Sequence, residues 1–139
     1  YETLLAQGHY FIDGAEELLE TLYGQYRMYL VTNGTLSVQK GRLKSSGISR
    51  YFEDIFISEE LGYNKPGREY FDCCFSRIPD FHKETAVIVG DSLTSDIQGG
   101  INAGIRTIWF NPSHEKTSEI IPDHEFESLM KLPELLSHI

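Results

Sequence analysis

Three short groups of polar residues in this sequence could together bind a phosphate group and stabilise its charge. Thr32-Asn33-Gly34 offers a hydroxyl, an amide and glycine backbone N–H, which are donors suited to an oxyanion. Asn64-Lys65-Pro66 offers an ammonium beside a proline, which restricts the local backbone direction. Asp91 and Asp96 are two carboxylates five residues apart, and hard oxygen ligands of this kind suit Mg²⁺.

Each group taken alone also has a plainer interpretation. Asn33-Gly34 is a common turn dipeptide, and a single lysine such as Lys65 usually lies solvated on the surface. One carboxylate of the Asp91 and Asp96 pair could simply cap a helix. The three groups are more informative together, because they share a place relative to the predicted strands.

Apolar runs predict strands that precede these polar groups. Ala86 to Gly90 is a continuous apolar run, typical of a strand buried on both faces. Further strands are predicted over Tyr26–Thr32, Asp54–Ser58 and Arg106–Phe110, with a short last one near Glu125–Phe126. Helical patterns alternate with them over about 13–24, 37–46, 67–75, 94–103 and 129–136.

This alternation predicts an α/β fold, a Rossmann-like parallel sheet with helices on both faces. Because ligands of such sheets bind outside the carboxyl ends of the strands, the polar groups are expected to meet at one edge.

Composition narrows the class of protein. The 139 residues include 21 acidic and 12 basic side chains, and the resulting net charge of −9 argues against a nucleic-acid partner. No apolar run approaches the ~18 residues that cross a bilayer, and the first residues lack a signal-peptide pattern. We therefore expect a cytoplasmic protein with no membrane partner. The adjacent Cys73 and Cys74 are expected to be reduced thiols.

Three segments resemble signature motifs of one superfamily. Val31 to Gly34, Asn64 to Gly67 and Val89 to Asp96 resemble the second, third and fourth motifs of the haloacid dehalogenase-type hydrolases. Ser58-Glu59-Glu60 and Trp109 to Pro112 are similar to its bacterial nucleotide 5′-monophosphatases, the pyrimidine nucleotidase-like group.

The resemblance implies an Mg²⁺-dependent phosphomonoester hydrolase that acts through an aspartyl-phosphate intermediate. It implies that Thr32, Asn33 and Gly34 bind the phosphoryl oxygens, and that Lys65 neutralises charge on the nucleophile and the phosphate. Asp91 would bind Mg²⁺, with Asp96 helping through water or by orienting Lys65. The implied substrate is a nucleoside monophosphate or a sugar phosphate. Oligomeric state is not indicated.

The first motif of that superfamily, Asp-x-Asp after an apolar strand, is absent from this sequence. The aspartates are 13, 54, 72, 80, 91, 96 and 123, and no two are separated by two. The nucleophile is therefore expected on a segment upstream of this chain, which alone would be inactive. Because the first-motif strand lies at the centre of the family's sheet, we expect a gap between the strands that end at Thr32 and Gly90.

The expected domain division follows from the same resemblance. Residues 1–10 would be the remnant of the last helix of a cap, with its linker, and 11–139 the core. Most of the helical cap would be missing. Asp13 is expected to cap the first helix of the core.

Two other interpretations remain open. The chain could be a truncated or non-catalytic domain that keeps the geometry of a phosphate site without turnover. Gly90-Asp91-Ser92-Leu93 is also the nucleophile signature of a serine esterase family, in which Ser92 would attack an ester. That family needs a histidine three residues after an aspartate, and none of the later histidines has one.

Overall fold

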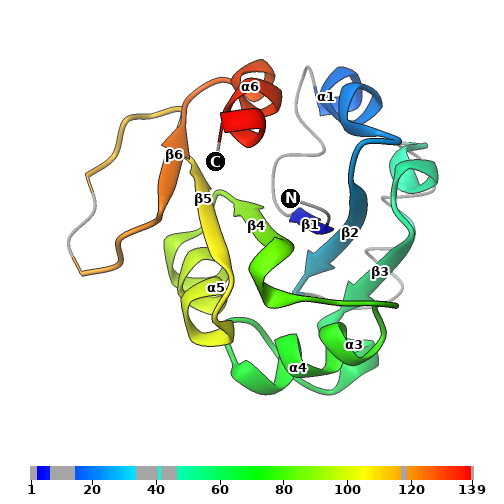
Figure 1. The fold of residues 1–139 in the computed structure, drawn as a ribbon. Helices are drawn as coiled ribbons and strands as arrows, with labels where there is room; N and C mark the ends of the chain where they lie inside the picture. The colour runs from blue at the N-terminus through cyan, green and yellow to red at the C-terminus, as the bar shows by residue number, and fades with distance from the viewer. Residues whose placement is uncertain (1–2, 7–14, 34–40, 42–46, 117–118, 139) are drawn as a thin grey trace.

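A six-stranded parallel sheet forms the centre of the computed structural model, which describes residues 3–6, 15–33, 41, 47–116 and 119–138. The strand order is β3-β2-β1-β4-β5-β6, and all five pairings are parallel (Figure 1). The strands are β1 (Thr3–Ala6), β2 (Arg27–Thr32), β3 (Asp54–Ile57), β4 (Ala86–Gly90), β5 (Arg106–Phe110) and β6 (His124–Phe126). The predicted α/β fold with a parallel sheet is confirmed.

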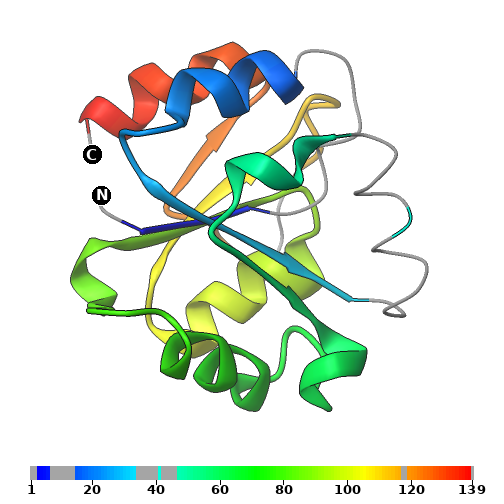
Figure 2. The same cartoon turned by 90° about the vertical axis from the view of Figure 1, so that its right-hand side faces the viewer.

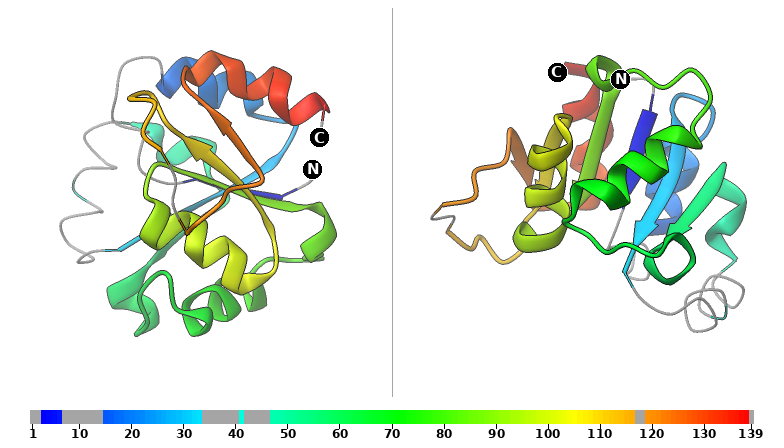
Figure 3. Two further views of the ribbon diagram at one scale, coloured as in Figure 1. Left: turned by 90° about the vertical axis from the view of Figure 1, so that its left-hand side faces the viewer. Right: turned by 90° about the horizontal axis from the view of Figure 1, so that it is seen from below.

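Helices cover both faces of the sheet, as Figure 2 shows. They are α1 (Ala15–Leu22), α3 (Ser58–Leu61), α4 (Arg68–Ser76), α5 (Gln98–Ala103) and α6 (Leu132–His138). Short 3₁₀ turns span Ile48–Tyr51, Lys83–Thr85 and Leu129–Lys131, and one π-helical turn spans Leu93–Ile97. Helices α1 and α6 lie on one face, and α4 and α5 on the other (Figures 2 and 3).

Alternation along the strands gives each face its own apolar core. In β4, Val87 and Val89 belong to the core under α1 and α6, whereas Ala86 and Ile88 belong to the core over α4 and α5. Helix α1 packs through its buried Leu18, Leu19 and Leu22. A strand that is buried on both faces must be apolar throughout, which is why Ala86 to Gly90 was the plainest strand in the sequence.

The predicted gap at the centre of the sheet is wrong, because β1 fills it. Thr3–Ala6 pairs with β2 on one side and with β4 on the other, and all four of its residues are buried. The remnant of a cap's last helix was expected within residues 1–10, but Thr3–Ala6 forms a strand instead. If β2 and β4 faced a gap, the backbone N–H and C=O groups along their inner edges would be buried without hydrogen bonds. Thr3–Ala6 pairs with both of these edges.

Some expectations fall outside the described residues. They are the helix over 37–46, apart from Gly41, the capping role of Asp13, and the domain division at residue 10. Within the described part of the chain, no helix has the length and apolar character needed to cross a membrane.

The packing of α5 on the sheet gives a test of the fold. A Cβ at Gly100 would lie 2.6 Å from methyl carbons of both Ile88 and Thr107, so the helix approaches the sheet only because this side chain is absent. We expect Gly100→Val to lower the free energy of unfolding by ~1–3 kcal/mol through overpacking, as measured by urea denaturation. The neighbouring Ile101 is exposed, so Ile101→Val is the control and should change stability much less. Equal effects of the two substitutions would contradict this packing.

Candidate phosphate site

A buried ion pair joins the ends of two strands. Lys65 is 4% exposed, and its Nζ lies 2.5 Å from Oδ1 of Asp96, which is 0% exposed. The ammonium also donates to the carbonyl oxygen of Val31 at 3.4 Å, near the end of β2. The other Asp96 oxygen accepts the Ser92 N–H at 3.2 Å, just after β4. The pair therefore fixes an ammonium at the carboxyl edge of the sheet, where ligands bind in this class of fold.

Burial works against the charge on both partners of this pair. It lowers the pKa of Lys65, while the charges of Asp96 and Asp91 oppose that shift. Burial likewise raises the pKa of Asp96, opposed by Lys65 and by the Ser92 N–H. Each partner thus offsets the cost of burying the other, and neither charge would be tolerated alone.

The ion pair also explains why residue 90 is a glycine. A Cβ at that position would lie 2.4 Å from Oδ2 of Asp96, which leaves no room for any side chain. The carboxylate packs directly against the backbone at the end of β4.

The Asn33 side chain holds the backbone of Lys65. Its Oδ1 accepts the Lys65 N–H at 2.9 Å, and its Nδ2 donates to the Lys65 carbonyl at 3.2 Å. From the other side, Asn102 on α5 donates to the carbonyl of Pro66 at 3.2 Å. The loop that bears the lysine is therefore tied both to the end of β2 and to α5.

Thr32 ends β2 with its own polar groups engaged. Its N–H donates to the hydroxyl of Tyr70 at 3.0 Å, and its Oγ1 donates to the carbonyl of Asn33 at 3.2 Å. Gly34, the third residue of this predicted group, lies outside the described residues. The direct phosphate contacts expected of Thr32 and Asn33 stay a prediction.

Asp91 is the exposed acid of the site. It follows β4 directly, and its charge acts on both Lys65 and Asp96. The indole N–H of Trp109, on β5, donates to the Asp91 carbonyl at 3.1 Å and so fixes the backbone behind the carboxylate. The structure thus brings Thr32, Asn33, Lys65, Asp91 and Asp96 to one edge of the sheet.

The acids of this site fit a magnesium ion in part. No group of three or more His, Cys, Asp or Glu residues that could hold a metal occurs among the described residues. Mg²⁺ commonly takes one or two carboxylates and keeps several waters, so the exposed Asp91 suits it. Both oxygens of Asp96 already have partners, which favours the expected role of orienting Lys65, and its part in binding metal stays a prediction.

Three residues that support this site were given no role in it by the sequence analysis. Asn102, Trp109 and Tyr70 each donate to a backbone carbonyl, and Tyr70 also accepts a backbone N–H. Such bonds depend on the packing of elements and have no motif of their own. Ser92, the residue of the esterase interpretation, accepts the Ser95 N–H at 3.3 Å as a helix cap. None of the histidines that the structure describes forms a hydrogen bond with Ser92.

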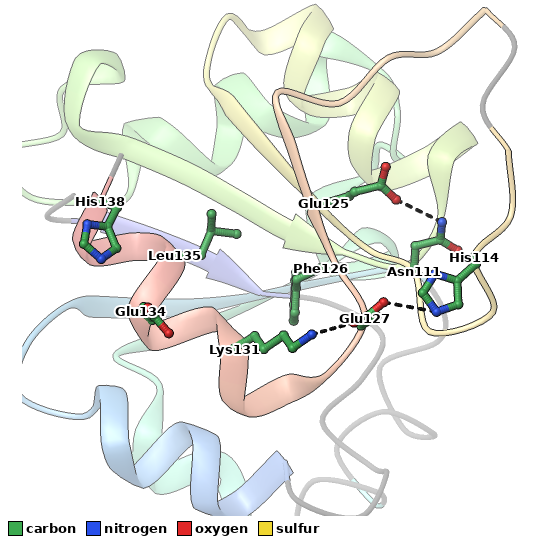
Figure 4. Close-up of a pocket in the computed structure, with 9 residues that line it drawn as sticks. All are labelled: Asn111, His114, Glu125, Phe126, Glu127, Lys131, Glu134, Leu135 and His138. Atoms are coloured by element: carbon green, nitrogen blue, oxygen red, sulfur yellow. Dashed lines mark hydrogen bonds and ion pairs between the residues drawn. The ribbon is translucent and has the colours of Figure 1, made fainter.

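A cavity of about 590 Å³ lies away from this site, between the edge strand β6 and α6 (Figure 4). Glu125, Glu127 and Glu134 line it, and Glu127 contacts both Lys131 and His114. Three carboxylates and a single lysine are poorly suited to a phosphate. None of the predicted site residues that the structure describes lines this cavity.

Comparisons with known proteins agree with the resemblance seen in the motifs. A family model described as haloacid dehalogenase-like hydrolase matches residues 1–110. The chain is 46% identical over 138 residues to HAD-hydrolase YfnB of Bacillus subtilis. It is 43% identical over 138 residues to pyrimidine 5′-nucleotidase PynA of Streptococcus pneumoniae, and 37% over 126 residues to pyrimidine 5′-nucleotidase YjjG of Escherichia coli.

A solved structure of YfnB, bound to magnesium, is similar to this fold with a TM-score of 0.88 and 47% identity. That match covers 90% of this chain and 55% of the YfnB chain. The sequence matches cover 99%, 98% and 90% of this chain but 59%, 58% and 56% of YfnB, PynA and YjjG. The chain thus spans little more than half the length of these relatives.

The buried ion pair predicts an asymmetric response to mutation. Asp96→Asn leaves the Lys65 ammonium buried without a counter-charge, and we expect it to lower the free energy of unfolding by ~3–5 kcal/mol. Lys65→Met/Asp96→Asn removes that ammonium and should recover part of the loss, although it carries one more substitution. Urea denaturation measures both variants, with Glu127→Gln as an exposed control that should change little. A double variant less stable than Asp96→Asn would argue against this account.

Proposed function

This chain belongs to the haloacid dehalogenase-like hydrolases, and on that premise we propose that it is the phosphate-holding part of an Mg²⁺-dependent phosphomonoester hydrolase. The observation that carries the proposal is the buried Lys65 ammonium, paired with Asp96 and close to the exposed Asp91. Phosphoryl transfer is mostly positioning and charge stabilisation, so a fixed cation at the carboxyl edge of the sheet suits that reaction.

Each described residue then has a distinct task. Lys65 neutralises charge on the phosphate and on the attacking group, and Asp96 keeps the ammonium charged and aimed. Thr32 and Asn33 lie at the end of β2, where Asn33 also sets the backbone of Lys65. Asp91 would hold the magnesium ion, which supplies further positive charge for the phosphoryl oxygens.

The attacking aspartate is proposed to come from a segment upstream of this chain. The central strand β1 consists of Thr, Leu, Leu and Ala, so it brings no carboxylate between the ends of β2 and β4. Because β1 fills the central position, an upstream strand could occupy that position only by displacing Thr3–Ala6. The aspartyl-phosphate intermediate belongs to the same proposal.

The proposed substrates are small phosphate monoesters, with nucleoside 5′-monophosphates first. The names of PynA and YjjG support a pyrimidine nucleotide. Sugar phosphates remain the alternative, and a cytoplasmic location stays a prediction. The rival function is a non-catalytic domain that keeps this site without turnover. Hydrolysis by the longer protein separates the two.

The contact between Trp109 and Asp91 allows metal binding to be measured without catalysis. Trp109 is the only tryptophan of the chain, and its N–H is bonded to the Asp91 carbonyl. We expect a saturable change in tryptophan fluorescence on titration with MgCl₂, reversed by EDTA. Asp91→Asn should abolish the change, whereas Asp72→Asn, an exposed acid on α4, should keep it. The same response in wild type and Asp91→Asn would exclude Asp91 as the ligand.

Hydrolysis is tested in a chain extended at its amino terminus by the segment encoded upstream. Phosphate release from pyrimidine and purine monophosphates and from sugar phosphates should require Mg²⁺. Lys65→Met should lower kcat/KM by ~10²–10³-fold, as for other groups that stabilise transition-state charge. Lys131→Met, an exposed lysine beside the β6 cavity, is the control. Comparable turnover by the 139-residue chain alone would refute the upstream nucleophile.

A further inference from the structure

Tyr70 on α4 places a buried hydroxyl between two strand ends. The residue is 0% exposed, and its hydroxyl accepts the Thr32 N–H at 3.0 Å and donates to the Phe56 carbonyl at 2.5 Å. Thr32 is the last residue of β2 and pairs with Ile57, which follows Phe56 and ends β3. One side-chain oxygen thus joins the last residue of β2 to the residue before the end of β3.

The packing of the Tyr70 ring does not require this hydroxyl. The ring contacts Phe71 edge to face at 5.2 Å, inside the core over α4 and α5, and a phenylalanine ring would fill the same space. A buried hydroxyl is costly unless it is hydrogen-bonded, and here both bonds are directed at backbone groups. Burial also raises the pKa of Tyr70 well above its usual value, so the hydroxyl keeps its proton and remains a donor.

The bonded groups continue from Tyr70 to the proposed phosphate site. Tyr70 holds the backbone of Thr32, the next residue is Asn33, and the Asn33 amide holds both backbone groups of Lys65. A shift of the Thr32 backbone would therefore move Asn33 and, with it, the loop that aims the ammonium. Misplacement of a catalytic group by about 1 Å can lower a reaction rate by about 10²-fold.

We propose that Tyr70 is a positioning residue of the phosphate site, which sets Thr32 and, through Asn33, Lys65, without touching the substrate. The inference rests on the proposed function, because it assigns Tyr70 a task only if a phosphate binds at this edge of the sheet.

The test is phosphate binding by Tyr70→Phe, measured by calorimetry with inorganic phosphate in MgCl₂. Tyr29→Phe is the matched control: Tyr29 is also buried, lies on β2 as Thr32 does, and pairs with Asp54 at the opposite end of the β2–β3 ladder. Its ring stacks on Phe56 at 5.7 Å in the same core, whereas its hydroxyl interacts with Glu53, so the same atom is removed away from the carboxyl ends of the strands. We expect Tyr70→Phe to weaken phosphate binding about five- to tenfold, and Tyr29→Phe to change it less than about twofold.

The outcomes separate this inference from the proposed function. If wild type binds phosphate and Tyr70→Phe binds it equally well, or Tyr29→Phe loses as much affinity, the positioning role is refuted and the function stands. If wild type binds no phosphate, the proposed function fails, and the role of Tyr70 fails with it.

A second variant covers the case in which Tyr70→Phe does not fold. Replacing Tyr70 by 3-fluorotyrosine fills nearly the same space but makes the hydroxyl a weaker acceptor for the Thr32 N–H. We expect a smaller loss of phosphate affinity, together with a shift of the Thr32 amide resonance in a ¹⁵N NMR spectrum. An altered Thr32 resonance with unchanged phosphate affinity would show that the bond is structural only, and would overturn the proposal.

Discussion

The Lys65–Asp96 pair has to form inside the protein, and much of the geometry around it follows from that requirement. A buried ammonium and a buried carboxylate are stable only in close contact and with further hydrogen bonds. The carboxylate lies against the backbone of residue 90, which must be glycine. The ammonium reaches the Val31 carbonyl, so the loop that bears Lys65 must cross the end of β2. Asn33 and Asn102 hold that loop from its two sides.

Buried side chains position the backbone of the candidate phosphate site, and exposed side chains remain accessible to ligands. Tyr70 and Trp109 are aromatic residues with buried rings and one polar atom each, directed at the backbone of Thr32 and Asp91. An aromatic side chain of this type contributes apolar packing and a fixed hydrogen bond at once. Asp91 is the exposed acid in front of them. This division explains how a site can be rigid where it is assembled and open where a cation would bind.

Parts of this structure could be predicted because they depend on local sequence. Ala86–Gly90 is apolar at every position, and Asp91 follows it at once, so the strand and its acid were both visible. β1 was missed because four residues have no measurable period, and its assignment depends on pairing with β4, far along the chain. The phosphate contact expected of Asn33 stays a prediction, whereas the bonds of its amide to the Lys65 backbone were not expected from the sequence. The sequence shows which hydrogen-bond donors and acceptors are present, but their partners depend on how the helices and strands pack.

The central position of β1 has a consequence for the order of folding. Thr3 pairs with Arg27 along one edge of β1 and with Ala86 along the other. The second pairing therefore joins residues that are much farther apart in the sequence than the first. Closing a longer loop costs more entropy, and contacts between distant residues slow folding. During synthesis the β1–β2 pair can form early, but its free edge must wait for β4. Until then this short apolar strand keeps one unpaired edge, which is open to pairing with the wrong strand.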